Sequence, residues 1–343
     1  MNDKNNPIQL GFQKRKQRWL FLTALLCMVT LVLSLVALMS GNTFYPIDVV
    51  IKVLLGEDIQ GATFAIATLR LPRMLAGLLV GLSFGIAGST FQTMLRNPLA
   101  SPDIIGVTSG SSVAAVFCIL VLKTSGFVVS FSAVVTGLCV ALLIYMLSRG
   151  GQFSGGRLIL IGIGVQAMLN SVISYLMLKA SQYDIPSAMR WLSGSLNGLR
   201  LSHIPSLAIV TLLFGLMILL LSRQLKILEL GEQSALTLGL RPDRIRILLV
   251  LSSVFLIAFA TAVTGPISFV AFLSGPIAKR MVGPGQSIQL PAGFVGASLV
   301  LLADTLGQFA FDTRFPVGVI TGILGAPYLL FLLVRMNQNG GTA

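Results

Sequence analysis

Long apolar runs separated by short polar segments occupy most of this 343-residue chain. The run 19–39 contains no charged side chain, and neither does the run 74–95. An apolar helix of about 20 residues crosses the hydrocarbon core of a bilayer, which is about 30 Å thick. The pattern predicts an all-α, polytopic transmembrane bundle of about ten spans, at 19–39, 74–95, 104–122, 127–148, 157–180, 204–222, 247–263, 265–280, 290–311 and 316–334.

The polar segments divide the chain into its parts. A basic N-terminus, 1–18, precedes a transmembrane domain, 19–335, and a polar tail, 336–343, follows it. The longest polar insert, 223–246, separates the sixth predicted span from the seventh. The apolar core of a signal peptide has about 7–15 residues, so the longer first run predicts an uncleaved helix.

Composition and charge fit a multi-pass protein of the cell membrane. Hydrophobic residues make up 55% of the chain and charged residues only 10%, whereas soluble domains carry about 25% charge. The net charge of +13 raises the question of nucleic-acid binding, but the basic residues are scattered between apolar runs, which argues against it. Of the 24 Lys and Arg residues, sixteen fall on the N-terminal side of the predicted spans and eight on the other. This bias predicts that both termini are cytoplasmic.

The sequence lacks the residues of several catalytic sites. The dipeptide Gly-Lys does not occur, so no P-loop for nucleotide phosphates is present. The one histidine, His203, lies at a predicted span end, where it makes a poor general base for a Ser-His-Asp set. With no second histidine or neighbouring cysteine, it does not indicate a metal site. Its three cysteines lie inside apolar runs without the spacing of a metal site or a disulfide framework. We therefore expect neither an intramembrane enzyme nor a cofactor.

The second predicted span combines a small-residue face with polar groups. Gly77, Gly81 and Gly85 recur every fourth residue and share one helix face, which favours close packing in lipid. Polar side chains in hydrocarbon need protein or water as partners, so we expect this helix to line a pathway or to pack closely. The candidate pathway and packing residues are Gly77, Gly81, Gly85, Ser83, Ser89, Gln92, Asn97 and Pro98.

Four blocks of sequence resemble the iron–siderophore and vitamin B12 family of ABC importer permeases, of the FecCD type. They are RLPR with the following Gly-rich span and NPLASPDIIGVTSG (69–110), the polar insert, GPISFVAFLSGPIAKRMVG (265–283) and LLADTLGQFAFDTRFPVGVITGILGAP (301–327). The third block departs from the family at Ser274-Gly275-Pro276, where relatives have Val-Pro-His. This departure weakens an assignment to vitamin B12.

The resemblance implies a permease subunit that imports a ferric siderophore by alternating access. Its implied partners are ABC ATPase subunits, an extracytoplasmic substrate-binding protein, a second permease subunit of similar or identical sequence, and membrane lipid. Vitamin B12 or haem is the alternative cargo. A proton-driven secondary transporter is an alternative of another class; it would use Asp304, the carboxylate that lies clearly inside a predicted span. A structural hydrogen-bond acceptor is the favoured role for Asp304.

The polar insert contains a short amphipathic pattern from Glu232 to Leu238, and Gly239 is a typical helix stop. Such a segment can simply be a solvated loop. In the family that the chain resembles, an E-x-A-x-x-L-G segment at this place docks on the ATPase. The resemblance assigns this coupling role to Glu232, Ala235, Leu238 and Gly239.

Three arginines lie at predicted span ends on the extracytoplasmic side. Arg70 and Arg73 flank Pro72, which predicts a stiff turn at the entry of the second span, and Arg314 precedes Pro316. Arginines at span ends often only anchor the protein to lipid headgroups. The resemblance implies that Arg70 and Arg73 receive acidic side chains of the binding protein, and more weakly that Arg314 does, since the usual basic position is occupied by Gln308.

Overall fold

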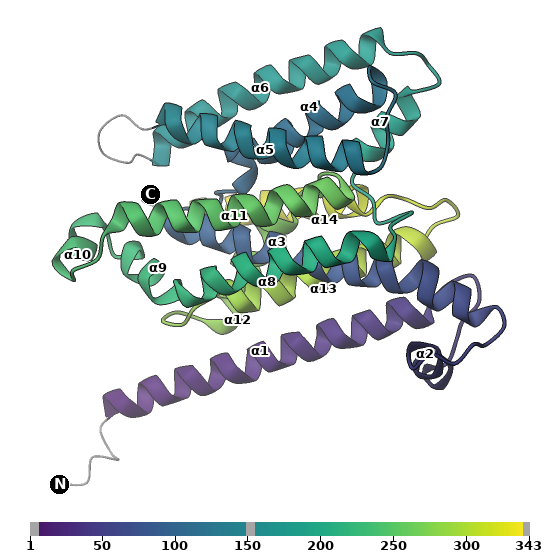
Figure 1. Ribbon diagram of the computed structural model, residues 1–343. Coiled ribbons are helices and arrows are strands. Elements are labelled where there is room, and N and C mark those ends of the chain that lie inside the picture. Colours follow the sequence, from purple (N-terminus) through teal and green to yellow (C-terminus); the bar gives the residue numbers. More distant parts are fainter. Residues whose placement is uncertain (1–6, 149–154, 339–343) are drawn as a thin grey trace.

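The computed structural model describes residues 7–148 and 155–338, and these residues form helices and no strand. The predicted all-α class is confirmed (Figure 1). The α-helices are α1 (Pro7–Met39), α2 (Ile47–Leu54), α3 (Leu71–Met94), α4 (Val107–Leu120), α5 (Phe127–Ser148), α6 (Gly155–Lys179), α7 (Ile185–Leu192), α8 (Ile204–Leu220), α9 (Ser222–Glu229), α10 (Glu232–Thr237), α11 (Pro242–Thr264), α12 (Val270–Val282), α13 (Gln289–Phe309) and α14 (Val317–Gln338).

Each of the ten predicted spans corresponds to one of these helices, but the helices differ in length. In the described part of the chain, 7 helical segments are long and apolar enough to cross a membrane, including α1, α5 and α13. Helix α4 has 14 residues and α12 has 13. At about 1.5 Å per residue these two helices are shorter than the hydrocarbon core. The number of ten crossings and the side of each terminus therefore stay predictions.

Several helices extend beyond the predicted apolar runs into polar sequence. Helix α1 begins at Pro7, α11 begins at Pro242, and α14 continues to Gln338. Long basic side chains carry their charge from a helix end toward water, so charged residues did not have to end these helices. The insert 223–246 is also largely helical, because it contains α9 and α10. Residues 339–343 of the predicted tail lie outside the described residues.

The chain enters α3 through a helix and not through a turn. A π-helical segment, Phe64–Arg70, runs directly into α3, and the N–H of Leu71 donates to the carbonyl of Ile66, five residues earlier. Pro72 therefore lies inside a continuous helix, and the predicted stiff entry turn is wrong. The wider π turn accommodates a proline, which lacks an N–H and crowds the preceding turn of an ordinary α-helix.

Helix α3 is the central element of the bundle. It packs against α8, α11, α12 and α13, while α1 lies on the outside against α13 (Figure 1). Helices α4, α5 and α6 form a further layer, and α11 contacts both α4 and α5. The small α7 packs on α4. These four helices lie in the second half of the chain and α3 lies in the first, so the bundle is one packed unit.

The glycines of α3 allow direct backbone contact with neighbouring helices. A Cβ added at Gly81 would lie 2.4 Å from the Cα of Ala297, and one at Gly85 would lie 2.1 Å from the carbonyl oxygen of Ala292, both in α13. One added at Gly88 would lie 1.9 Å from the carbonyl oxygen of Ala271 in α12. Gly77 meets side chains instead, at 3.1 Å from Leu196. Residues with a side chain would therefore separate α3 from α13.

We expect Gly81→Leu to destabilise the protein by at least about 1–3 kcal/mol, since added bulk must move a backbone that has no free volume. The thermal unfolding midpoint of the purified protein in detergent measures this effect. Gly164→Leu in α6 is the matched control, because no atom lies within 4 Å of a Cβ added there. Equal midpoints for the two variants would contradict the close packing of α3.

Candidate functional site

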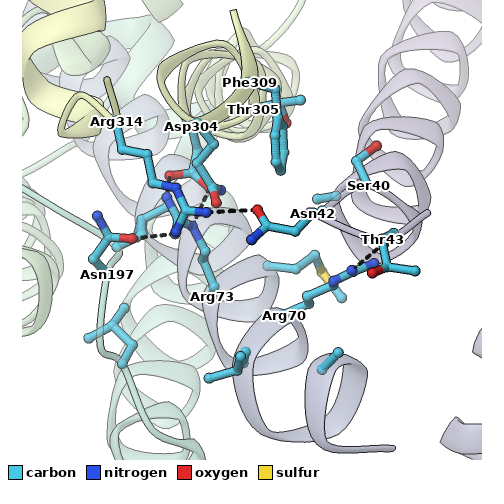
Figure 2. Close-up of a pocket in the computed structure, with 18 of the residues that line it drawn as sticks. Ser40, Asn42, Thr43, Arg70, Arg73, Asn197, Asp304, Thr305, Phe309 and Arg314 are labelled. Carbon is cyan, nitrogen blue, oxygen red and sulfur yellow. Dashed lines mark hydrogen bonds and ion pairs between the residues drawn. The ribbon is translucent and has the colours of Figure 1, made fainter. Parts of the chain in front are cut away.

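Segments far apart in the sequence enclose a cavity of about 340 Å³ at one end of the bundle. The C-terminal end of α1, the start of α3, the end of α13 and the segment 196–199 contribute to its wall (Figure 2). The three arginines that the sequence singles out, Arg70, Arg73 and Arg314, all line this cavity. The fold thus brings together Arg70 and Arg314, which are 244 positions apart in the sequence.

Arg73 forms a bidentate ion pair with Asp304. Its Nε and Nη2 donate to the two carboxylate oxygens, each at 2.7 Å, and only 4% of Asp304 is exposed. Gln308 donates a further hydrogen bond to Asp304 at 3.0 Å, and Asn197 accepts one from Arg73. The paired, fully hydrogen-bonded geometry is the strong form of an arginine–carboxylate contact. It ties α3, α13 and the segment after α7 to one another.

Arg70 satisfies the carbonyl groups at the C-terminal end of α1. Its guanidinium donates to the carbonyls of Leu38, Met39 and Thr43 at 2.9, 2.8 and 2.7 Å, and it lies 5.0 Å from the ring centroid of Tyr45. The last carbonyls of a helix lack intrahelical partners and carry partial negative charge, which a cation stabilises. Gly41 leaves room for this contact, because a Cβ there would lie 2.1 Å from the guanidinium.

Within the described part of the chain, Arg314 has one hydrogen-bond partner, the neutral side-chain oxygen of Asn42, at 2.8 Å (Figure 2). Each of the three arginines therefore has an acceptor within the chain, and Arg73 has a charged one. Docking of a partner on these arginines stays a prediction.

The polar side chains of α3 are buried against protein. Ser83 shares a hydrogen bond of 2.9 Å with Thr211 of α8, and Ser89 donates to carbonyls of its own helix. Gln92 donates to the carbonyls of Phe272 and Pro98 at 2.9 and 3.1 Å. Gln92 and Pro98 also line a cavity of about 640 Å³ at the far end of α3, and Asn97 accepts a hydrogen bond from the N–H of Leu99 nearby. A pathway role for these residues stays a prediction.

The predicted short helix in the insert is present as α10, with glycines in left-handed or extended positive-φ conformations on both sides, Gly231 and Gly239. Ala235 is fully buried, whereas Leu236 and Leu238 are 56% and 61% exposed. Glu232 does not point freely into solvent, because it accepts a hydrogen bond of 2.9 Å from the nearly buried Arg246 of α11. This ion pair fastens α10 to the start of a long helix.

Sequence reasoning missed the partners of the charged residues. The Asp304–Arg73 and Glu232–Arg246 pairs join residues 231 and 14 positions apart, and nothing in the local pattern links them. It also missed Asp103, in the connection between α3 and α4, which accepts hydrogen bonds from Ser101 and Thr108. Burial raises the pKa of Asp103, and these two hydrogen bonds oppose the rise. The described residues hold no group of three or more His, Cys, Asp or Glu side chains that could bind a metal ion.

Comparisons with known proteins give one consistent result. The model of the FecCD transport family matches residues 26–335. The ferric enterobactin transport system permease protein FepG of Escherichia coli (strain K12) is 36% identical over 323 residues, which cover 94% of this chain and 98% of the relative. The Fe(3+)-citrate import system permease protein YfmE of Bacillus subtilis (strain 168) is 34% identical over 323 residues, covering 93% and 96%.

A solved structure agrees with these relatives. An inward-facing metal-chelate type ABC transporter superposes with a TM-score of 0.82 at 27% identity, over 91% of this chain and 98% of the other. The similarity in structure therefore extends over most of the chain.

We expect Asp304→Asn to lower stability by about 3–5 kcal/mol, because it leaves Arg73 largely buried without its charged partner. In the double variant Arg73→Gln/Asp304→Asn part of this loss should be recovered, since no unpaired charge remains. Thermal unfolding midpoints of the wild type, the single variants Arg73→Gln and Asp304→Asn, and the double variant measure the coupling between the two side chains. Additive losses in the double variant would show that the pair does not stabilise the α3–α13 contact.

Proposed function

Because this chain belongs to the FecCD transport family, we propose that it is the transmembrane permease subunit of an ATP-driven importer that carries a ferric siderophore across the cell membrane. The observation that carries the proposal is the full-length similarity to permeases of ferric enterobactin and ferric citrate systems, together with the superposition on a metal-chelate transporter. The 7 membrane-length helices suit a multi-pass protein that forms a path for a bulky solute.

The internal contacts of Asp304 support an ATP-driven importer over a proton-driven one. A carboxylate that relays protons has to exchange them with water or with other acids. Asp304 instead holds a bidentate arginine partner and a glutamine, and it is almost fully buried. These contacts favour a structural role, in which Asp304 orients Arg73 and joins α3 to α13.

An ABC ATPase subunit is the proposed partner of α10. Leu236 and Leu238 present apolar surface to solvent at the end of the bundle away from Arg73, where Figure 1 shows α10 projecting. The buried Ala235 and the Glu232–Arg246 pair hold α10 on the body of the protein. A displacement of α10 by the ATPase would therefore be transmitted to α11, which packs directly on the central α3.

A second permease subunit is the proposed partner of α6. Asn170, Ser171 and Ser174 are exposed on this helix, which is long enough to span the membrane. Ser171 and Ser174 donate to carbonyls of their own helix, whereas the side-chain amide of Asn170 is unfavourable against lipid tails. Asn170 therefore favours protein or a water-filled path beside this face. Pairing of two such faces would enclose a polar route for the chelate. The extracytoplasmic binding protein would then dock at the other end from the ATPase, around Arg70, Arg73 and Arg314.

We expect proteoliposomes that contain the permease and its ATPase to accumulate a ferric siderophore only when ATP and the binding protein are supplied. A protonophore should leave this uptake unchanged, since the ATPase provides the driving force. Parallel assays with vitamin B12 and haem identify the cargo. Uptake that requires a proton gradient and proceeds without ATP would contradict the proposal.

We expect Leu238→Asp to reduce co-purification of the ATPase by about tenfold or more, since a charge replaces an exposed apolar contact at the proposed interface. Leu55→Asp is the matched control, because Leu55 is 80% exposed and lies next to α2 at the opposite end of the bundle. This design avoids Ala235, whose substitution would disrupt the packing of α10 itself. Wild-type recovery of the ATPase with Leu238→Asp would remove α10 from the interface.

A further inference from the structure

A second cavity, of about 450 Å³, lies beside α7 at the same end of the bundle as the Arg73 cavity. Figure 1 shows α7 and α2 at this end and α10 at the other. The connection between α4 and α5, the exposed side of α7 and the segment before α8 form its wall. The basic and aromatic side chains that line it are Lys123, Arg190, Trp191 and His203.

Arg190 differs from the arginines of the first cavity in having no internal acceptor. It is exposed, and within residues 7–148 and 155–338 no hydrogen bond or ion pair engages its guanidinium. Lys123, by contrast, forms an ion pair with Asp184, which also lines the cavity. An anion that reaches Arg190 displaces only water, whereas one that reaches Arg73 competes with Asp304.

The two cavities are neighbours. Asn197 and Leu199 line both of them, and Asn197 accepts a hydrogen bond from Arg73. A contact made in the α7 cavity therefore adjoins the ion pair that joins α3 to α13. The surface that the two cavities form together is continuous, with the segment 193–200 as its centre.

The end of α7 is held rigidly by backbone contacts at three glycines. Added Cβ atoms would lie 2.2 Å from the carbonyl oxygen of Pro266 at Gly194, 2.2 Å from that of Trp191 at Gly265, and 2.1 Å from that of Ser193 at Gly318. The N–H of Gly318 also donates to the carbonyl of Gly194 at 3.1 Å. Arg190 thus projects from an element that is fixed to the end of α11 and the start of α14.

We propose that the α7 cavity is a second contact site for the extracytoplasmic binding protein, in which Arg190 receives a carboxylate of that protein. This inference rests on the proposed function. The guanidinium fork pairs with a carboxylate through two parallel hydrogen bonds, and an uncommitted cation on a rigid helix accelerates the encounter with an acidic partner.

The test compares Arg190→Glu with Lys179→Glu, which makes the same change of charge at the end of α6, outside both cavities. The probe is the purified binding protein that supports uptake by the wild-type permease, and its association rate with permease in nanodiscs is measured at low and at physiological salt. We expect Arg190→Glu to slow association about 3- to 10-fold at low salt and less at physiological salt. Lys179→Glu should change the rate less than twofold, and Arg190→Lys should retain most of the wild-type rate.

Folding of each variant is checked by its elution in size-exclusion chromatography, and Arg190→Gln replaces Arg190→Glu if the charge reversal does not fold. Equal association rates for Arg190→Glu and Lys179→Glu would overturn the inference. Reduced uptake with an unchanged association rate would also overturn it, because Arg190 would then act at a step after docking. A wild-type permease that does not respond to the binding protein at all would instead contradict the proposed function.

Discussion

Direct contact between backbones, made possible by glycine, is the constraint on which this bundle depends. Within a membrane, water does not drive helices together, so close packing and hydrogen bonds must do so. Helix α3 meets α13 at Gly81 and Gly85 and meets α12 at Gly88, in each case without an intervening side chain. Because α3 also contacts α8 and α11, its position fixes most of the bundle around it.

The same helix connects the two ends at which partners are proposed to bind. Arg73 lies in its first turn and Gln92 in its last, about 28 Å apart at the usual rise of an α-helix. Arg73 holds α13 through Asp304, and Gln92 holds the start of α12 through the carbonyl of Phe272. A tilt of α3 would alter both contacts together, and a rigid, buried helix transmits such a movement with little loss.

The sequence was sufficient for the helical class, for the approximate position of all ten predicted helices and for the short helix that ends before Gly239. Its apolar runs carry that information locally. It was insufficient for the start of α3, because the π-helical segment before Pro72 depends on how Phe64–Arg70 packs. The Asp304–Arg73 and Glu232–Arg246 ion pairs could not be predicted from the sequence for a related reason. Whether Arg73 faces solvent or Asp304 depends on the packing of α3 against α13, and no local pattern specifies that contact.

The long-range contacts of α1 set an order of events during biogenesis. This helix is synthesised first, yet its hydroxyl partner across the interface, Ser298, follows Thr30 by 268 residues. Trp19 and Arg18 likewise donate to the carbonyls of Ser287 and Met281. Until α13 is inserted, α1 lacks these partners and packs only on elements that precede α13, such as α2 and α3. Its polar side chains are compatible with lipid in the meantime, because Thr30 and Ser34 also donate to carbonyls of their own helix, at 2.8 and 2.9 Å. The hydroxyl protons of these two residues are therefore not left unpaired in hydrocarbon. The first helix to enter the membrane thus completes its packing only after α13 has been inserted.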